Sequence, residues 1–308
     1  MGLKRKEHMK RTNDLRIAES RLLISPATLK SDLPMTEDSN RTVVESREVI
    51  TNILFKKDPR LLAVVGPCSI HDPKAAMEYA ERLNRVRKSV QDKIFLVMRT
   101  YFEKPRTVIG WKGLITDPHL DGSYDIETGL RLSRKLLLDV TALGLPCGSE
   151  MLDPIIPQYI ADLISWASIG ARTSESQTHR EMASGLSMPV GFKNATSGEV
   201  KPALNAMESA RHPHHFIGID REGRASVLGT AGNPASHLIM RGGSSGPNYY
   251  EENVEQAEQM LSGLGIDPAV IIDCSHANSG KQYQRQARVL RAVLDLSLIH
   301  ISEPTRPY

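Results

Sequence analysis

Short apolar runs alternate with longer amphipathic stretches along most of this chain, and no other feature of the sequence restricts the possible folds as strongly. Each run is rich in Val, Ile, Leu and small residues, and the stretches between runs carry apolar residues at helical spacing. This alternation is typical of parallel strands that helices cover on both faces. The runs are residues 61–67, 94–100, 144–150, 167–172, 188–194, 236–242 and 269–274, and the helical stretches include 73–90, 124–143, 157–166, 176–186 and 251–264.

A series of β/α units of this kind favours an α/β fold of the (β/α)8 TIM-barrel type over an open sheet. Two segments depart from the alternation. Residues 1–56 begin with a polar and basic stretch, and their apolar residues recur at helical spacing over 46–54. This pattern indicates an amino-terminal extension. Residues 214–230 have the pattern of strand, polar turn and strand, which predicts a β-hairpin inserted before the sixth run. The barrel itself is expected over 57–294.

The composition excludes several classes of protein. The 308 residues include 39 Lys and Arg against 36 Asp and Glu, and the net charge of +3 is too small for a general nucleic-acid binder. No apolar run approaches the ~20 residues of a membrane-spanning helix. The cysteines are odd in number and far apart, at Cys68, Cys147 and Cys274, which argues against disulfides and favours the cytoplasm. We therefore expect a cytoplasmic protein with neither nucleic-acid nor membrane partners, in which Cys147 is a packing residue.

Charged residues follow the apolar runs, at the positions where barrel enzymes carry their functional groups. Like charges at one end of a barrel repel one another, so their convergence predicts a polyanionic ligand with phosphate or carboxylate groups. Any single one of them could instead be a solvated loop charge or a surface ion-pair partner. We call this set the strand-end cations: Arg99, Lys104, Arg106, Arg172, Lys193 and Arg241.

Two further residues suggest a metal ion. Cys68 follows the first run and His276 follows the seventh, and a thiolate with an imidazole suits a divalent first-row ion. Taken alone, Cys68 is more typical of a small buried apolar residue, and His276 of a hydrogen-bonded loop histidine. The pairing at the ends of the first and seventh runs is what favours the metal hypothesis.

Long strings of this sequence resemble one family. They are GPCSIHD at 66–72, VMRTYFEKPRTVIGWKGLI at 97–115, IGARTSESQTHREMASGLSMPVGFKN at 169–194, IMRGG at 239–243 followed by PNY, and DCSHAN at 273–278. Over roughly residues 10–294 the chain resembles the class I, microbial, feedback-regulated 3-deoxy-D-arabino-heptulosonate 7-phosphate (DAHP) synthases. The resemblance implies a metal-dependent, aldol-like condensation of phosphoenolpyruvate with D-erythrose 4-phosphate, which releases phosphate and opens the shikimate pathway to the aromatic amino acids.

The resemblance also implies a role for each site residue. Arg99, Arg172, Lys193 and Arg241 resemble the phosphoenolpyruvate-binding set, Arg106 and Thr107 resemble the binders of the erythrose 4-phosphate phosphate, and Lys104 resembles a lysine that lies between the two substrates as a candidate proton donor. Glu150 resembles the carboxylate near the reaction centre, and Cys68 and His276 resemble two of four ligands to Mn, Fe, Co or Zn. The family further implies a homo-oligomer when full length and an aromatic amino acid inhibitor, and the string at 176–194 is most similar to the tyrosine-sensitive members.

The sequence departs from this family after residue 294. The family continues with an eighth strand that carries a glutamate ligand and a loop that carries an aspartate ligand, whereas residues 295–308 resemble translated sequencing-adapter read-through. We therefore expect a carboxyl-terminally truncated chain with a non-native tail at 295–308, without the last β/α unit and two metal ligands. Such a chain is expected to be inactive.

Two other functions remain open from the residues. Lys193 ends a run where an imine-forming lysine of a Schiff-base aldolase could lie. A nucleophilic lysine is not expected among five other cations, however, and this reading leaves Cys68 and His276 without a role. The second alternative is a phosphometabolite-binding module that keeps the anion site and has no turnover.

Overall fold

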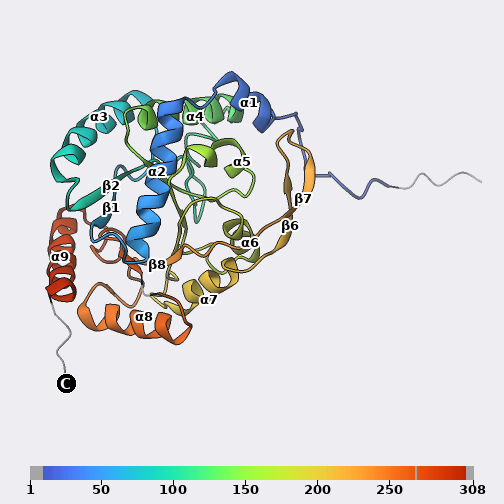
Figure 1. Ribbon diagram of the computed structural model, residues 1–308. Coiled ribbons are helices and arrows are strands. Elements are labelled where there is room, and N and C mark those ends of the chain that lie inside the picture. The colour runs from blue at the N-terminus through green and yellow to red at the C-terminus, as the bar shows by residue number, and fades with distance from the viewer. Residues whose placement is uncertain (1–9, 268, 303–308) are drawn as a thin grey trace, which may run out of the picture.

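The computed structural model describes residues 10–267 and 269–302, and a parallel β-sheet forms its centre. Seven strands lie in the order β1-β2-β3-β4-β5-β8-β9, and every neighbouring pair is parallel. The sheet curls with its helices into the predicted TIM-barrel-like fold (Figure 1). Within the described residues no strand pairs β9 with β1. The strands are β1 (Leu61–Val65), β2 (Ile94–Arg99), β3 (Cys147–Glu150), β4 (Trp166–Ile169), β5 (Val190–Lys193), β8 (Ser236–Met240) and β9 (Val270–Ile272).

Helices surround the sheet, and one of them, α2, crosses the middle of the view in Figure 1. The predicted helical stretches are confirmed, although most are shorter than their patterns suggested. The helices are α1 (Pro26–Asp32), α2 (Glu37–Leu54), α3 (Pro73–Val90), α4 (Ile126–Ala142), α5 (Pro157–Ile160), α6 (Gln177–Ser184), α7 (Lys201–Ala210), α8 (Glu251–Gly263) and α9 (Gln286–Ser302), with 3-10 turns η1 (Ala161–Leu163) and η2 (Tyr283–Arg285). Among the residues that the structure describes, no helix has the length and apolar character needed to cross a bilayer.

Helix α2 closes the amino-terminal end of the sheet. Its Ile50 and Leu54 are buried in a cluster with three side chains from β2, β4 and β8, namely Val97, Trp166 and Ile239. Arg47 on the same helix donates hydrogen bonds to the carbonyl oxygens of Ala161 and Ile164, which lie just before β4. The carboxyl ends of the strands therefore lie at the opposite end of the sheet from α2.

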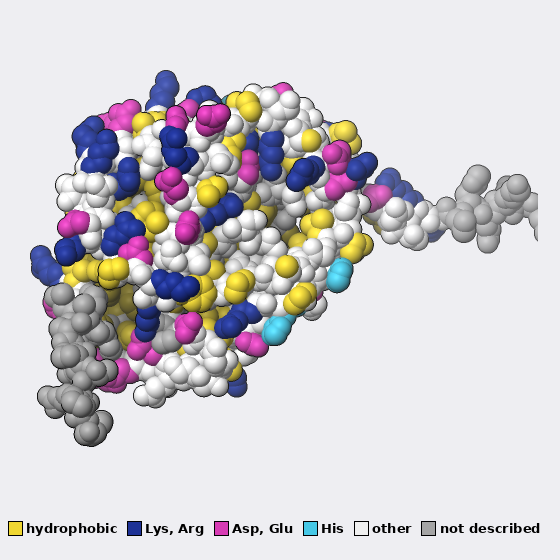
Figure 2. All heavy atoms as spheres, in the orientation of Figure 1, with side chains coloured by type: hydrophobic (Ala, Val, Ile, Leu, Met, Phe, Trp, Pro, Cys, Tyr) yellow, Lys and Arg dark blue, Asp and Glu magenta, His cyan; other side chains and the backbone are white. Residues whose placement is uncertain are grey.

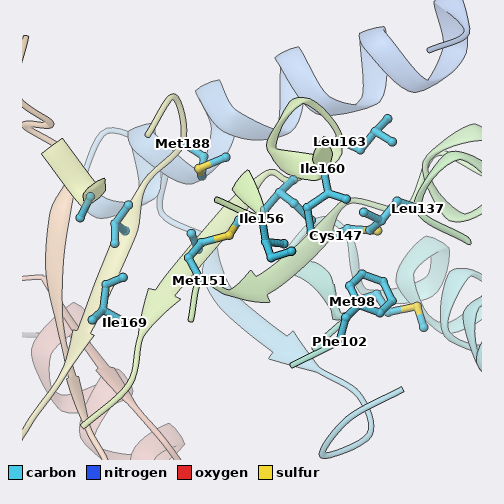
Figure 3. Close-up of a cluster of buried hydrophobic side chains, with 14 of the residues drawn as sticks. Met98, Phe102, Leu137, Cys147, Met151, Ile156, Ile160, Leu163, Ile169 and Met188 are labelled. Atoms are coloured by element: carbon cyan, nitrogen blue, oxygen red, sulfur yellow. The ribbon is translucent and has the colours of Figure 1, made fainter. Parts of the chain in front are cut away.

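The main core lies between the sheet and the surrounding helices. Figure 3 shows Cys147, Leu137 and Ile160 close together, from β3, α4 and α5. Cys147 is fully buried, and burial raises the pKa of its thiol to about 12. The prediction that Cys147 is a packing residue is confirmed.

The inserted hairpin is also confirmed. Strands β6 (His215–Ile219) and β7 (Ala225–Gly229) pair antiparallel beside the main sheet, and β8 pairs directly with β5. The amino-terminal extension lies beside this hairpin (Figure 1), and the Ala27 amide donates a 2.7 Å hydrogen bond to the Arg221 carbonyl.

Local backbone chemistry explains where the predicted boundaries were wrong. The run at 144–150 becomes a strand only from Cys147, because Gly144 has a φ of +77° in the turn that follows α4. At the carboxyl end, α9 continues to Ser302, so the backbone of the expected tail is helical over 295–302. Residues 303–308 of that tail, and residues 1–9 of the extension, lie outside the described residues.

Candidate active site

The carboxyl ends of the strands bring two of the strand-end cations to Tyr101, which follows β2. The Arg99 guanidinium carbon lies 3.5 Å from the centre of the Tyr101 ring, and Lys193 Nζ lies 5.5 Å from it. The Tyr101 hydroxyl shares a 2.6 Å hydrogen bond with Ser168 Oγ. An aromatic face attracts cations, so this ring holds the two positive groups near each other.

Lys193 forms a buried ion pair with Glu150. Lys193 Nζ lies 3.3 Å from Glu150 Oε2, and the two residues are only 5% and 7% exposed. Burial acts to lower the pKa of Lys193, but Tyr101 and Glu150 act against it, and the net pKa is raised. Lys193 is therefore an ammonium ion at neutral pH.

Glu150 uses one carboxylate oxygen to pair with Lys193, and its other oxygen has no hydrogen-bond partner within the part of the chain that the structure describes. Its Oε1 is buried and accepts no hydrogen bond from any described residue. A Cβ at position 170 would lie 2.8 Å from that oxygen, so Gly170 provides the space that the carboxylate fills. Buried polar atoms in folded proteins nearly always have partners, so an open acceptor next to a cation cluster indicates a ligand or a water.

Cys68 lies beside Lys104 and is exposed, not buried as a lone cysteine would be. Lys104 Nζ donates a 2.7 Å hydrogen bond to Cys68 Sγ, and Arg99 Nη2 donates to the Cys68 carbonyl at 3.2 Å. Burial acts to raise the pKa of the thiol, but Lys104 and Arg99 lower it, and the net pKa is below its usual value. The two cations thus favour a thiolate.

His276 is oriented by Asp273. His276 Nδ1 lies 2.7 Å from Asp273 Oδ2, and His276 itself has a φ of +46°. The pKa of Asp273 lies well below its usual value, because hydrogen bonding and charge from His276 and the charge of Lys193 outweigh the effect of burial. A carboxylate that holds one ring nitrogen directs the other toward a ligand.

The charges on β4, β8 and β9 also act on one another. Burial lowers the pKa of Arg241, the charge of Asp273 raises it, and the charge of Arg172 lowers it further. Arg172 is exposed and donates to the Pro105 carbonyl at 3.3 Å, which connects the loop after β4 to the loop after β2. A bound anion near these residues would relieve the repulsion between the two arginines.

Arg106 and Thr107 lie apart from this cluster on the exposed loop after β2. Arg106 Nε donates to the Trp111 carbonyl at 2.7 Å, and Thr107 is exposed. The described contacts do not join either residue to the group around Tyr101. The loop therefore presents a second cationic position at the same end of the sheet, separate from the buried one.

Sequence reasoning missed three residues at this site. Tyr101 and Asp273 were given no role, although a carboxylate three residues before a candidate metal ligand was an available signal. Glu103 is 8% exposed and accepts a 3.2 Å hydrogen bond from the Asp153 amide. Burial, followed by the charge of Asp153, raises the pKa of Glu103 to about 8.

The donor chemistry of Cys68 and His276 fits a first-row divalent ion. One is a thiol with a lowered pKa, and the other is an imidazole whose Nδ1 is held by a carboxylate. Within the described part of the chain, no three His, Cys, Asp or Glu side chains gather into a metal-binding group.

Comparison with known proteins gives consistent results over most of the chain. Residues 33–296 match the model of the DAHP synthetase I family. The chain is 52% identical over 282 residues to the Tyr-sensitive phospho-2-dehydro-3-deoxyheptonate aldolase of Escherichia coli (strain K12), which is 92% of this chain and 79% of that protein. It is also 52% identical over 277 residues to the Phe-sensitive enzyme of the same organism, 90% of this chain and 79% of that protein.

A solved structure agrees with the sequence matches. The phospho-2-dehydro-3-deoxyheptonate aldolase from Francisella tularensis SCHU S4 has a TM-score of 0.90 at 50% identity, over 91% of this chain and 82% of that one. Both the fold and the sequence therefore relate this chain to enzymes of one activity. The identities to the Tyr-sensitive and Phe-sensitive enzymes are equal at 52%, so overall identity does not favour the tyrosine-sensitive type.

Proposed function

The chain belongs to the DAHP synthetase I family, whose enzymes catalyse the first step of the shikimate pathway, and from this premise we propose how its own residues carry out that reaction. The substrates are phosphoenolpyruvate, D-erythrose 4-phosphate and one water, and the products are DAHP and phosphate. The observation that carries the proposal is the buried Lys193–Glu150 pair, which lies beside Tyr101 and Arg99 at the carboxyl ends of the strands.

Phosphoenolpyruvate binds to Arg99, Arg172, Lys193 and Arg241 in this proposal. The raised pKa of Lys193 supports a permanent positive charge in the buried part of the site. Arginine forks hold a carboxylate or a phosphate in a fixed, bidentate geometry, while the Lys193 ammonium contributes a point charge. The lowered pKa of Arg241 reflects burial near Arg172, and the substrate's negative charges compensate for both effects.

Glu150 acts next to this bound substrate. Its Oε2 holds Lys193, and its open Oε1 accepts a hydrogen bond from a water or a substrate hydroxyl at the reaction centre. The carboxylate thereby orients a group that must lose or gain a proton during the condensation.

Lys104 and the loop after β2 serve the second substrate. Lys104 is the candidate proton donor, because its ammonium donates to the Cys68 thiol and the residue lies two positions before Arg106 in the chain. Arg106 and Thr107 bind the phosphate of erythrose 4-phosphate, and their exposure supports capture of a substrate that arrives from solvent.

Enzymes of this family generally depend on a metal ion. We propose that Cys68 and His276 contribute a thiolate and an imidazole to such an ion, which is Mn, Fe, Co or Zn. When bound, the ion supplies Lewis-acid polarisation of the aldehyde oxygen. Asp273 keeps His276 in the tautomer and orientation needed for binding.

The residues weigh against a Schiff-base aldolase. An imine-forming lysine must lose its proton, whereas the pKa of Lys193 is raised and its ammonium is paired with Glu150. Borohydride treatment in the presence of substrate is expected to leave Lys193 unmodified. A covalent adduct on Lys193, detected by mass spectrometry, would contradict the proposed roles.

Regulation and assembly belong to the amino-terminal extension and the hairpin. Feedback-sensitive relatives imply an aromatic amino acid inhibitor, and neither segment forms part of the sheet that carries the site. Ile217 and Val227 face each other across the hairpin and are 82% and 73% exposed, which supports a subunit contact there. Cys68, Cys147 and Cys274 are all free thiols, which supports the cytoplasm as the compartment.

The proposal is tested by product formation. The enzyme is incubated with phosphoenolpyruvate, erythrose 4-phosphate and manganese, and DAHP and phosphate are measured together. In a chain extended with the eighth strand and the glutamate and aspartate ligands expected of the family, Glu150→Gln keeps the shape of the side chain and removes its charge, and it is expected to lower kcat by about a hundredfold. If that extended chain binds phosphoenolpyruvate and gives no DAHP, the protein is a binding module instead.

A further inference from the structure

Three buried asparagines connect the carboxyl ends of β5, β8 and β9. Asn194 follows β5, Asn248 lies in the loop after β8, and Asn278 lies in the loop after β9. They are 0%, 8% and 4% exposed. All three belong to the sequence strings GFKN, PNY and DCSHAN, yet none of the roles assigned above uses them.

Two of these asparagines hold the backbone at Arg241. Asn194 Oδ1 accepts a 2.7 Å hydrogen bond from the Arg241 amide, and Asn248 Oδ1 accepts one of 2.7 Å from the next amide, that of Gly242. Asn248 Nδ2 in turn donates to Asn194 Oδ1 at 3.2 Å. Both amides lie beyond the last residue of β8, where the sheet no longer supplies partners, so these side chains replace the sheet's hydrogen bonds.

Asn278 extends the connection to the loop of His276. Its Oδ1 accepts a 2.8 Å hydrogen bond from the Asn248 amide, and its Nδ2 donates to the carbonyls of Met240 at 3.1 Å and Asp273 at 3.0 Å. The Asn278 side-chain amide therefore links the end of β8 to the segment that carries Asp273 and His276.

A glycine makes this close packing possible. Gly242 has a φ of +69°, and a Cβ at this position would lie 2.8 Å from Asn278 Oδ1. The backbone after Arg241 therefore runs against Asn278 with no space for a side chain, and the Arg241 backbone cannot shift without breaking these hydrogen bonds.

We propose that Asn194, Asn248 and Asn278 form a positioning network that fixes Arg241 for phosphoenolpyruvate binding and couples it to the loop of His276. The inference rests on the proposed function, because it takes Arg241 as a contact to phosphoenolpyruvate. The asparagines touch no substrate and act through the backbone they hold. A site built in this way keeps a charged side chain within the narrow geometry that anion binding requires.

The chain supplies a matched control in Asn233. This asparagine is 5% exposed, its Nδ2 donates to the carbonyls of Leu186 and Met188, and its Oδ1 accepts from the Ala235 amide. It lies just before β8, at the opposite end of the strand from Arg241. Asn233→Ala therefore removes a comparable set of buried hydrogen bonds away from the site.

The experiment compares phosphoenolpyruvate binding by titration calorimetry in Asn248→Ala, Asn278→Ala, Arg241→Ala and Asn233→Ala. We expect the dissociation constant to rise about tenfold or more in the first three variants and to stay unchanged in Asn233→Ala, although Asn233→Ala also lowers the melting temperature. The Asn248→Ala/Asn278→Ala double variant is expected to lose little more than either single variant, because both break one connection.

The outcomes distinguish a failure of the proposed role of Arg241 from a failure of the asparagine network. If Arg241→Ala binds phosphoenolpyruvate normally, the assignment of Arg241 in the proposed function is overturned, and the inference with it. If Arg241→Ala binds weakly but both asparagine variants bind normally, only the inference is overturned. An equal loss of affinity in Asn233→Ala would also overturn it, since the effect would then be general destabilisation.

A second variant covers the case in which the alanine variants do not fold. Asn248→Asp keeps the shape of the side chain and the acceptor for Gly242, and it replaces the donor that bonds Asn194 Oδ1 at 3.2 Å by a carboxylate oxygen, which repels that acceptor. The dissociation constant of phosphoenolpyruvate is expected to rise about threefold or more in this variant, while that of erythrose 4-phosphate stays within about twofold. Equal changes in both constants would contradict a role specific to Arg241.

Discussion

Replacing Lys193 by Met separates the structural role of its charge from its role in binding. Lys193 and Glu150 are buried with Nζ and Oε2 3.3 Å apart, so the substitution leaves the Glu150 charge buried and unpaired. Losing one partner of a buried pair costs about 3–5 kcal/mol of unfolding free energy. Losing one charge-assisted contact to phosphoenolpyruvate costs about 1.5–3 kcal/mol, or roughly ten- to a hundredfold in affinity.

The double variant Lys193→Met/Glu150→Gln distinguishes these two costs. With both charges removed, the unfolding free energy is expected to return to within about 1 kcal/mol of the unaltered protein. Phosphoenolpyruvate affinity is expected to stay low, because the ammonium is still absent. Stability is measured by urea denaturation and affinity by calorimetry.

A surface pair provides the control. Arg82 and Glu78 form an ion pair on α3 with both side chains more than half exposed, and Arg82→Met is expected to change stability by less than about 1 kcal/mol. If the double variant regained phosphoenolpyruvate affinity together with stability, the Lys193 ammonium would not be a binding group and the reasoning would be refuted.

Three further predictions concern pH, metal and assembly. Because the pKa of Glu103 is raised to about 8, the folded protein keeps a proton that the unfolded chain releases, and the free energy of unfolding falls by up to about 1.4 kcal/mol per pH unit as pH rises from ~5 to ~8. Glu103→Gln is expected to flatten this dependence of the unfolding free energy on pH in urea denaturation. An unchanged dependence on pH would contradict the burial argument. Asp273→Asn is expected to weaken manganese binding about ten- to a hundredfold in chelator competition, since His276 loses its orienting carboxylate, and unchanged binding would exclude that role. Ile217→Lys is expected to shift the protein toward smaller oligomers in sedimentation experiments, whereas Val86→Lys, at a half-exposed apolar position on α3, is not; equal behaviour of the two would remove the hairpin from the interface.

The alternation of apolar runs and helical stretches was enough to predict the sheet. The runs at 61–67, 94–100 and 236–242 each contain a strand, because a strand buried on both faces must be apolar throughout. Two helices were missed. Helix α1 is short, although Ser25 before Pro26 was an available start signal, and α7 lies next to the hairpin, where the alternation is interrupted.

The cations of the site could be predicted, but their partners could not. A charged residue at the end of an apolar run is visible in the sequence, and the topology brings such ends together. The Tyr101 ring between Arg99 and Lys193, and the open oxygen of Glu150, depend on tertiary contacts between residues far apart in the chain. Sequence spacing carries no information on those contacts.

Figure 2 adds an observation that composition alone could not supply. On the face crossed by α2, Lys and Arg side chains are interspersed with Asp and Glu, so this face carries no large area of one charge. The strand-end cations lie at the opposite end of the strands, where Arg241, Arg172 and Asp273 act on one another. The small net charge therefore hides a local concentration of positive groups at the site.

The most direct test of the account is the affinity of the protein for phosphoenolpyruvate when one exposed strand-end cation is removed. Arg172→Ala breaks only a 3.3 Å hydrogen bond to the Pro105 carbonyl, so the fold is expected to be unaffected. Calorimetric titration of Arg172→Ala is expected to give a dissociation constant roughly ten- to a hundredfold above that of the unaltered protein. The control variant Arg131→Ala, whose side chain on α4 pairs with Asp32 and Glu127, is expected to leave the dissociation constant unchanged. The same dissociation constant in Arg172→Ala and the unaltered protein would contradict the claim that the strand-end cations bind phosphoenolpyruvate.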